Sequence, residues 1–425
     1  MTSPTIEFFG GLGVIGSSKI LITDGHHRVL LDVGVDIPAG GDLFRPPVTM
    51  RPGRELADRL RVAAAPHIPG LFDPAALADG DPLAAAWPGV TEVFLSHPHI
   101  DHVGLAGFVR PELPVHAHRD AVAVLRALSG AGAGLAGGDP DWRELAAGEH
   151  TAVGGMDVQC VRVDHDVPGA CGYLVHTTAG TLAYTGDIRF HGRHRHRADA
   201  FVDGARGAAV LVTEGTTLGL DIPAGPPRTE DDVAASFGQS LAATEDLVLL
   251  AVYPRDVERV AQFAEVAAAA GRRVVFPAQA AAALRALGVG AIATIGVDVS
   301  AADLADSPGA YVVQPAHTDL PGLLDLPIGP GTVLVHANGE PLGDFDTRWG
   351  VFVDWLAALG IPLVRAGCSG HAMPADLHAM VERIAPDVVF PIHTTAPGRL
   401  LVPAGVRRVI ARYGARYDFA GNPLD

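Results

Sequence analysis

The chain has 425 residues, 48% of them hydrophobic, and a formal net charge of −17. This length favours two domains, because one hydrophobic core seldom serves so long a chain, and the apolar content indicates a folded globular protein. The negative charge argues against a protein that coats nucleic acid with its whole surface, although it is compatible with a local channel lined by arginine and histidine.

Cysteine usage and hydropathy indicate the compartment. Three cysteines, Cys160, Cys171 and Cys368, give no disulfide framework, which is typical of a reducing cytoplasm. No basic and apolar leader opens the chain, and no apolar run approaches the length of a membrane span. We therefore expect a soluble cytoplasmic protein with no membrane partner.

The first segment, 6–34, contains three apolar runs separated by turns, which predict three strands. The glycine-rich turn GGLGVIGSS does not predict a dinucleotide-binding loop, because a second strand follows it too soon for a long helix. Asp32 ends the third strand, where it either caps a turn or braces a neighbouring functional loop from behind. Residues 35–90 are rich in proline and glycine around one helical patch at 55–65, which suggests a lid or a specificity loop.

A strand at 93–95 leads into a loop that carries His97, His99, Asp101 and His102. Pro98 disfavours helical geometry at the preceding residue, so we expect residues 97–100 to form a loop. Three imidazoles and one carboxylate are ligands that zinc prefers, and the set leaves room for two metals. A polar surface turn is the plainer alternative, but such turns rarely need this density of ligands.

The hydrophobic patterns of the next segments predict a helix from 103 to 109, a strand at 114–118, a helix at 120–128 and a loop at 130–138. His116 and His118 alternate with apolar residues, so we expect ordinary strand histidines there. His165 follows the strand VQCVRV, and Asp187 follows the strand in TLAYTG. Ligands at the ends of successive strands are a common way for a rigid sheet to hold a metal.

These segments resemble a known family. HPHIDH, VDHDVPGACGY and YTGDIRF resemble the second, third and fourth motifs of the metallo-β-lactamase fold, and Asp32 matches the first. VTEGTT, CSGHAMPADL and PIHTTAP resemble motifs A, B and C of its β-CASP branch, which includes RNase J and the pre-mRNA 3′-end endonuclease. The resemblance implies an α/β protein: an αββα sandwich at 1–218 and 363–425, with an inserted β-CASP domain at 219–362. Only the segment 394–425 follows His393, so the C-terminal domain of RNase J is expected to be absent.

The expected insertion has the pattern of a parallel α/β domain. DLVLLAVY and RRVVFPA predict buried strands on either side of an amphipathic helix at 256–270. GAYVVQPA and GTVLVHA predict further strands, and residues 352–360 a helix. The family's hydrolases often have an aromatic-rich stretch where this chain has HANGEPLGDFDTRWG, so no substrate contacts are carried over to that stretch.

The resemblance also implies roles for the candidate ligands. One zinc would be held by His97, His99 and His165, a second by Asp101, His102 and His393, and Asp187 would bridge the two. Manganese is an alternative metal. A hydroxide shared by the two cations could attack a phosphodiester, with Asp101 and Asp187 as catalytic carboxylates. A core histidine is the plainer alternative for His393.

Departure of the alkoxide also needs a proton. His371 lies in a Ser-Gly-His-Ala turn and is the candidate general acid, and Glu214 is its candidate partner. The alternatives are helix capping by Ser369 and a surface salt bridge for Glu214. In the basic run 189–197, Arg189 and His191 could bind substrate phosphates, while Ser369 and Gly370 admit the substrate backbone. A solvated loop is equally compatible with that run.

Three functions remain open on this fold. The first is a two-zinc phosphodiesterase that cleaves RNA or, second in preference, single-stranded DNA. The second is a small-molecule hydrolase acting on a lactone, thioester or phosphoester, which the negative charge favours. The third is an inactive binding subunit, which the complete ligand set disfavours. The sequence leaves the oligomeric state open, and a homo-oligomer is compatible with it.

Overall fold

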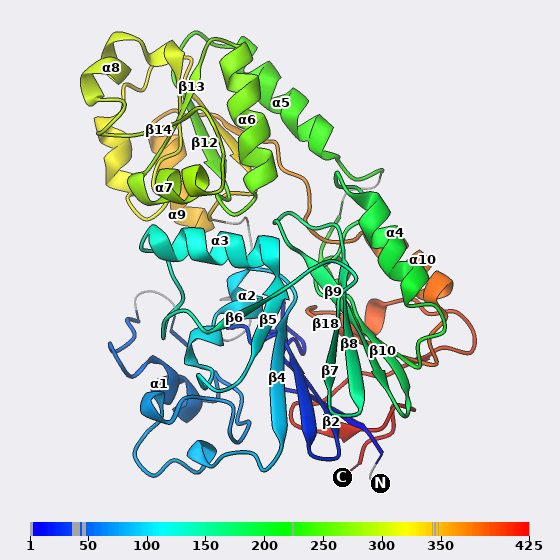
Figure 1. Cartoon of the computed structure of the whole chain (residues 1–425). Coiled ribbons are helices and arrows are strands. Elements are labelled where there is room, and N and C mark those ends of the chain that lie inside the picture. Colours follow the sequence, from blue (N-terminus) through cyan, green and yellow to red (C-terminus); the bar gives the residue numbers. More distant parts are fainter. Residues whose placement is uncertain are drawn as a thin grey trace.

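The computed structural model describes residues 3–35, 43–44, 48–222, 225–341, 343, 346 and 348–424. The chain forms two lobes, and both of its ends lie at the far end of the lower one (Figure 1). Residues 36–42 and 45–47 of the expected insertion at 35–90 lie outside the described residues, and the described remainder contains one α-helix, α1 (Glu55–Arg61).

The lower lobe is a sandwich of two seven-stranded sheets. The first has the order β20-β1-β2-β3-β4-β5-β6 and the second the order β19-β18-β11-β10-β9-β8-β7. Strands of the first sheet are β1 (Thr5–Phe8), β2 (Ile20–Asp24), β3 (His27–Leu31), β4 (Val90–Leu95), β5 (Val115–His118), β6 (Trp142–Leu145) and β20 (Arg416–Tyr417). Strands of the second are β7 (His150–Val153), β8 (Met156–Arg162), β9 (Cys171–Thr177), β10 (Gly180–Tyr184), β11 (Val210–Glu214), β18 (Val388–Ile392) and β19 (Arg407–Arg408).

The core of this lobe lies between the sheets, where Phe8 and Phe94 of the first meet Tyr173 and Phe390 of the second in one buried cluster. Apolar side chains on the outer faces pack on helices: α1, α2 (Ile100–Val103) and α3 (Arg119–Gly130) on the first sheet, and α4 (Arg195–Gly204) and α10 (Pro374–Ile384) on the second. The lobe is therefore the expected αββα sandwich. It also brings the C-terminal strand β18 beside β11, which precedes it by more than 170 residues in the chain.

Most of the predicted elements in this lobe are present, with one error. The three N-terminal strands, the strand at 114–118 and the helix at 120–128 are confirmed by β1, β2, β3, β5 and α3. The helix predicted at 103–109 is wrong: α2 ends at Val103 and a separate 3₁₀ turn spans Ala106–Phe108. The loop predicted at 97–100 is one residue too long, since α2 already begins at Ile100. The helix ends early because Gly104 and Gly107 interrupt the later segment.

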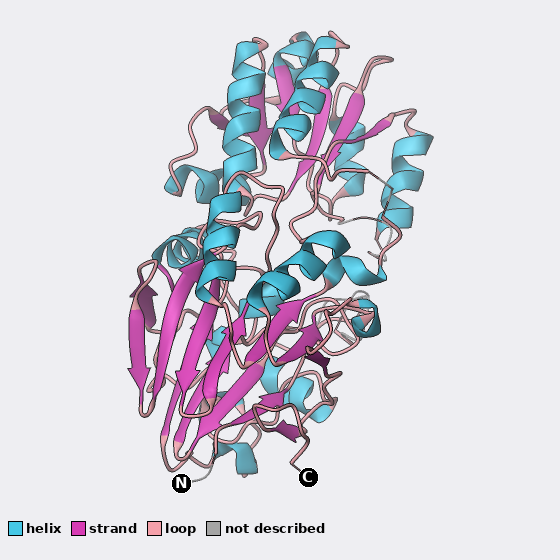
Figure 2. Cartoon of the chain, turned by 90° about the vertical axis from the view of Figure 1, so that its right-hand side faces the viewer, coloured by secondary structure: helices cyan, strands magenta, loops and turns pink. Residues whose placement is uncertain are grey.

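The upper lobe is a parallel six-stranded sheet with the order β14-β13-β15-β12-β16-β17. Its strands are β12 (Val248–Val252), β13 (Arg273–Phe276), β14 (Ile292–Thr294), β15 (Tyr311–Val313), β16 (Val333–Ala337) and β17 (Leu363–Arg365). Its helices are α5 (Glu230–Ala242), α6 (Val257–Ala269), α7 (Ala278–Ala286), α8 (Ala301–Asp306) and α9 (Trp349–Ala358). Helices cover both faces of this sheet (Figure 2), and each face has its own buried cluster.

All predicted elements of the insertion are therefore present. The last strand of its sheet, β17, begins just past the expected boundary at 362, so the division into 1–218, 219–362 and 363–425 stays a prediction. No helix within the described ranges is long and apolar enough to cross a membrane.

Candidate metal centre between the two lobes

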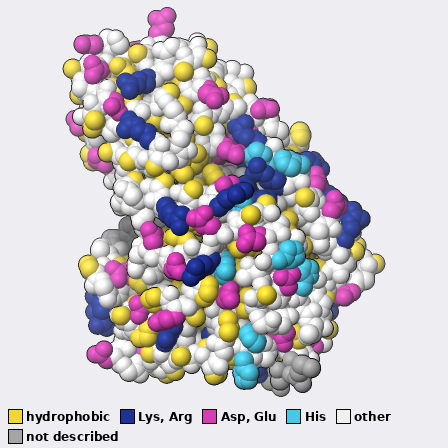
Figure 3. All heavy atoms as spheres, viewed as in Figure 1, with side chains coloured by type: hydrophobic (Ala, Val, Ile, Leu, Met, Phe, Trp, Pro, Cys, Tyr) yellow, Lys and Arg dark blue, Asp and Glu magenta, His cyan; other side chains and the backbone are white. Residues whose placement is uncertain are grey.

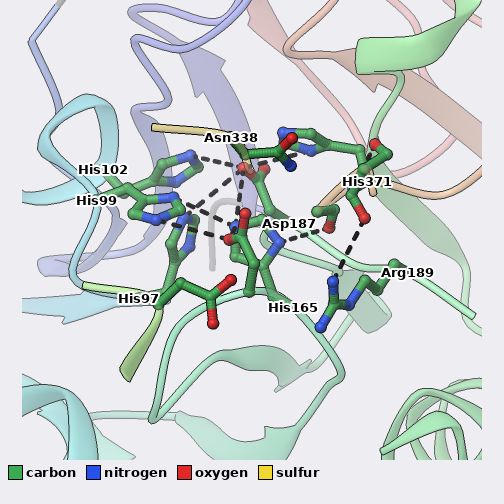
Figure 4. Close-up of polar contacts among 12 residues, drawn as sticks. His97, His99, His102, His165, Asp187, Arg189, Asn338 and His371 are labelled. Carbon is green, nitrogen blue, oxygen red and sulfur yellow. Dashed lines mark hydrogen bonds and ion pairs between the residues drawn. The ribbon is translucent and has the colours of Figure 1, made fainter. Parts of the chain in front are cut away.

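The candidate ligands lie where strands of the two lower sheets end. Strand β10 is parallel to β11, and β11 is parallel to β18, so the residues after these strands reach one edge of the second sheet. Asp187 follows β10, Glu214 ends β11 and His393 follows β18. The histidine-rich loop after β4 comes to the same edge from the first sheet, and it meets Asp187 there (Figure 4).

Two groups of potential ligand atoms share Asp187. The first contains His97, His99, His165 and Asp187, and the second contains Asp101, His102, Asp187 and His393; within each group the atoms lie within 4.8 Å of one another. Asp187 Oδ2 is 3.4 Å from His102 Nε2, 3.6 Å from His393 Nε2, 3.7 Å from His97 Nε2 and 3.8 Å from His165 Nε2. The seven predicted ligands are thus brought together in the two sets that the resemblance implied.

The hydrogen bonding of these groups fits a pair of bound cations. His97 Nε2, His102 Nε2 and Asp187 Oδ1 are buried and have no hydrogen-bond partner within the described part of the chain. Buried polar atoms are normally paired, since leaving one unpaired costs about 1–3 kcal/mol. Here the unpaired atoms are imidazole nitrogens and a carboxylate oxygen that face one small volume. Such atoms are the ligand atoms of a metal centre.

The histidines are oriented from behind by their other ring nitrogens. His165 Nδ1 is 2.6 Å from the carbonyl oxygen of Gly370, and His393 Nδ1 is 2.8 Å from Thr216 Oγ1. His102 Nδ1 is 2.7 Å from Asp32 Oδ2. Each contact leaves Nε2 directed at the centre, as in metal sites where a second partner fixes the ligand tautomer.

Asp32 carries out the bracing role expected from the sequence. Besides the contact with His102, its carboxylate accepts hydrogen bonds from the Ser96 amide at 2.6 Å, the Ser96 hydroxyl at 2.7 Å and the Tyr184 hydroxyl at 2.5 Å. Asp32 has a φ of +60°, a conformation that costs a non-glycine residue energy, so the fold holds it there against local preference. The loop after β4 is therefore anchored on both sheets.

The protonation of the first group is also suited to a cation. Burial lowers the pKa of His99 to about 3, and burial lowers the pKa of His97 well below its ordinary value, so both rings are neutral near pH 7. Metal ligation requires this neutral imidazole. For His102, burial acts to lower the pKa, but Asp187, Asp101 and Asp32 outweigh it and raise the pKa.

Beside the second group lies a pair formed by His371 and Glu214. His371 Nδ1 is 3.4 Å from Glu214 Oε1, 3.6 Å from Asp187 Oδ2 and 3.1 Å from Thr216 Oγ1. Burial acts to lower the pKa of His371, but Glu214 and then Asp187 outweigh it and raise the pKa to about 9. The ring is therefore positively charged near neutral pH.

Glu214 is buried and does not form a surface salt bridge. Its two oxygens accept hydrogen bonds from the amides of Thr216 at 2.9 Å and Ala372 at 3.2 Å, so it also fixes the turn that carries His371. The hydroxyl of Ser369 accepts the His371 amide at 3.0 Å. Helix α10 begins only at Pro374, so Ser369 caps this turn and not the helix.

The predicted phosphate-binding residues are placed differently. Arg189 is only 2% exposed, and its guanidinium pairs with Glu230 at 2.7 Å and with Asp164 at 3.3 Å. The prediction that Arg189 contacts substrate is corrected accordingly: its charge is already matched inside the protein. His191 Nε2 is 2.9 Å from the Ser369 carbonyl oxygen, so it supports the His371 turn.

Two further residues of the basic run join the lobes. Arg193 bonds Gln262, and His194 lies 2.9 Å from Glu258, both on α6 of the upper lobe. Arginine and histidine side chains accordingly gather at the waist of the molecule (Figure 3). At Arg193 and His194 the run is therefore neither a free solvated loop nor part of the ligand centre, whereas Arg195 and His196 are exposed.

A cavity of about 280 Å³ opens beside the ligand groups. The lower lobe contributes Asp101, Asp187, His371 and Gly370 among others, and the upper lobe contributes Tyr253, Asn338 and Glu340. Sequence reasoning missed these three residues. Tyr253 and Asn338 directly follow the buried strands β12 and β16, and residues at the carboxyl ends of parallel strands are a usual place for ligand contacts, which is the signal that could have found them.

Comparison with known proteins agrees with this geometry. A family model described as a beta-lactamase superfamily domain matches residues 27–248. The chain belongs to this superfamily. It is 25% identical to Ribonuclease J from Mycobacterium tuberculosis over 97% of this chain and 74% of that protein. It is 24% identical to Ribonuclease J from Mycolicibacterium smegmatis, over 92% of this chain and 68% of that one.

A crystal structure of a protein of unknown function from Enterococcus faecalis is also similar, with a TM-score of 0.81 and 27% identity over 98% of this chain and 100% of that one. The matches and the fold together identify an RNase J-like hydrolase of the metallo-β-lactamase fold with a β-CASP insertion. The His and Asp cluster at its centre agrees with the divalent metal that this fold implies.

Proposed function

We propose that this chain is a two-zinc phosphodiesterase of the cytoplasm that cleaves RNA, and that His371 is its general acid. One observation carries the proposal: two ligand groups share Asp187, and His371, paired with Glu214, lines the cavity beside them. The names of the relatives, Ribonuclease J, support RNA as the substrate.

The first zinc would be held by His97, His99 and His165, the second by Asp101, His102 and His393, with Asp187 between them. Two bound cations would lower the pKa of a water molecule between them and stabilise negative charge on the phosphoryl oxygens. Manganese is an alternative metal, because carboxylate oxygens are present in both groups.

The protein's own part in the reaction is to supply and hold a proton. His371 Nδ1 faces Glu214 and Thr216, which leaves Nε2–H as the donor to the departing oxygen of the substrate. Glu214 keeps the ring charged, and Ser369 and His191 fix the turn around it. Gly370 leaves the cavity wall without a side chain next to His371, which gives the substrate backbone room to approach.

The experiment uses purified protein whose metal content has been measured. It is incubated with 5′- and 3′-labelled RNA and with single-stranded DNA, beside an Asp187→Ala variant prepared in parallel. We expect cleavage of RNA that a chelator abolishes and that zinc or manganese restores, with no cleavage by the variant. Metal-loaded protein that cleaves neither nucleic acid would refute the proposal.

A second candidate, hydrolysis of a small molecule, is favoured by the charge of the cavity. Four carboxylates line it, those of Asp101, Asp166, Asp187 and Glu340, and no lysine or arginine of the described residues does so. Such a wall suits a compact substrate better than a long polyanion. Turnover of a lactone, a thioester or a phosphate monoester by protein that is inactive on RNA would establish this alternative.

A further inference from the structure

Asn338 is a residue of the upper lobe whose backbone is held in an unfavourable conformation next to the site. It follows β16 directly and lines the cavity beside the ligand groups. Its φ is +60°, in the left-handed region, which asparagine adopts more readily than most residues but still at an energetic cost. The sheet holds it there through an isolated β-bridge to Val252 at the end of β12. Backbone outliers of this kind concentrate at functional sites, so the side chain of Asn338 is a candidate for a role in the reaction.

The side chain of Asn338 binds the segment that leads to His371. Its amide group donates a hydrogen bond to the carbonyl oxygen of Cys368. Gly367 makes this contact possible, because a Cβ on residue 367 would lie 1.8 Å from Asn338 Oδ1. Asn338 therefore holds the chain where it leaves the upper lobe after β17, at the start of the turn formed by residues 368–371.

The other side of this turn is bound to the lower lobe. His191 Nε2 donates to the Ser369 carbonyl oxygen at 2.9 Å, and the Ala372 amide donates to the Ile188 carbonyl oxygen at 2.6 Å. The turn that carries His371 is therefore positioned from both lobes, and Asn338 supplies a side-chain contact from the upper one.

The role assigned to His371 tolerates little displacement. A general acid has to lie within hydrogen-bond reach of the oxygen that it protonates, and a misplacement of about 1 Å can cost up to about a hundredfold in rate. The seven candidate metal ligands, in contrast, lie outside the turn, and the turn reaches them through the Gly370 carbonyl oxygen, which is 2.6 Å from His165 Nδ1. A small movement of the turn should therefore affect proton transfer before it affects metal binding.

We propose that Asn338 is a positioning residue for His371: its hydrogen bond to Cys368 holds the general acid in place from the upper lobe. This inference rests on the proposed function, because it assigns Asn338 to the step in which the departing oxygen receives its proton. The step then depends on both lobes, although the donor and its partner Glu214 belong to the lower one.

The test compares Asn338→Gly and Asn338→Asp with the wild type on RNA and on a nitrophenyl phosphodiester, whose leaving group needs no proton. Glycine adopts a φ of +60° freely, so Asn338→Gly removes the side chain without straining the backbone. Asn338→Asp keeps the shape that packs on Gly367 and removes the N–H donor. Gln262→Ala is the matched control, because Gln262 is another amide side chain of the upper lobe that bonds the lower one, through Arg193, away from the cavity.

We expect kcat on RNA to fall about tenfold or more in both Asn338 variants, while the rate on the activated diester falls about twofold or less. Asn338→Gly should keep the wild-type KM for RNA, the wild-type metal content and a cooperative thermal unfolding transition. Gln262→Ala should cleave both substrates like the wild type.

The double variant Asn338→Gly with His371→Ala identifies the group through which Asn338 acts. Its rate on RNA should equal that of His371→Ala alone, because a donor that has been removed cannot be misplaced. The inference is overturned by effects that multiply in the double variant, by equal slowing of the two substrates, by loss of a metal, or by a rise in KM with kcat unchanged, which would make Asn338 a substrate contact. Failure of the proposed function is distinguishable, because it would appear as metal-loaded wild-type protein that does not cleave RNA or as His371→Ala that slows both substrates equally.

Discussion

Removal of His371 and removal of His393 should impair the enzyme in different ways. His371 belongs to neither ligand group that contains Asp187, so His371→Ala should leave two metals bound. The rate on RNA should fall by about a hundredfold or more, as for loss of a general acid. His393 belongs to the second group and its Nε2 is 2.9 Å from Asp101 Oδ2, so His393→Ala should lower metal content and activity together.

The size of the effect at Glu214 follows from the charge that it imposes on His371. With the pKa at about 9, about 99% of the His371 rings are protonated at pH 7, against about one quarter at the ordinary value of 6.5. At pH 8 the two fractions are about 90% and about 3%. Of the two carboxylates that most raise this pKa, Glu214 contributes more than Asp187, so the loss of the Glu214 charge should remove most of the effect. Glu214→Gln should therefore cost up to about fourfold at pH 7 and up to about thirtyfold at pH 8, the limit in which the pKa of His371 returns to its ordinary value.

The assay is a pH profile with two substrates, RNA and a nitrophenyl phosphodiester whose leaving group needs no proton. The wild-type rate on RNA should hold up to about pH 9 and fall above it, because the raised pKa keeps the acid form present until then. In Glu214→Gln the fall should begin nearer 6.5, and the activated diester should escape most of the loss in both variants. Loss of a metal from His371→Ala, or equal slowing of the two substrates, would refute the general-acid role.

Further predictions concern metals, salt and stability. Elemental analysis of protein never exposed to a chelator should find two divalent ions per chain, and one or none would contradict the two-metal assignment. The slope of log affinity for RNA against log salt should be shallow in binding titrations, because so acidic a chain can neutralise few phosphates. Glu230→Gln should lower the free energy of unfolding in urea by less than about 3–5 kcal/mol, the loss for a fully broken buried pair, since Arg189 and Arg259 lose their shared carboxylate but keep Asp164 and Asp256. Burial acts to raise the pKa of Glu230, but the two arginines outweigh it and lower the pKa to about 2. The contribution of Glu230 to stability should therefore be complete above about pH 4.5 and be lost as the pH falls toward 2. Urea denaturation midpoints that do not change over that range would contradict the stabilising role of Glu230.

The candidate ligands could be predicted from the sequence because they lie in short motifs at strand ends, and the family resemblance joins those motifs into one site. A strand that ends in a short loop places the next few side chains at the edge of a sheet, and parallel strands end at the same edge. Asp187 and His393 follow β10 and β18, and Glu214 ends β11, so the three residues lie at one edge of the second sheet. Strand ends alone indicated His165 and Asp187, whereas the inclusion of Glu214 and His393 came from the family resemblance, because no local pattern shows that β18 pairs with β11.

Arg189 shows where that reasoning stops. Its place in a basic run indicated a phosphate ligand. In the structure Arg189 is buried against Glu230, which lies at the start of α5 in the upper lobe. The positions of Tyr253 and Asn338 after β12 and β16 mark them as candidate contacts of some ligand, but they and Glu340 reach this cavity only because the upper lobe is packed over it. Contacts made across two lobes depend on how the lobes are arranged, and no local pattern encodes that arrangement.

The buried charges at the lobe junction explain how the cavity keeps its shape. Glu230 of the upper lobe bonds Arg259 of α6 at 2.7 Å and Arg189 of the lower lobe at 2.7 Å, and Arg189 lies two residues after Asp187. Buried ion pairs add little net stability, because desolvation offsets their attraction, but they demand one geometry and are costly to break. The segment that carries Asp187 is thereby tied to the helices of the lobe that carries Tyr253 and Asn338. Arg189 thus serves the site indirectly, by holding the upper wall of the cavity over the ligand groups.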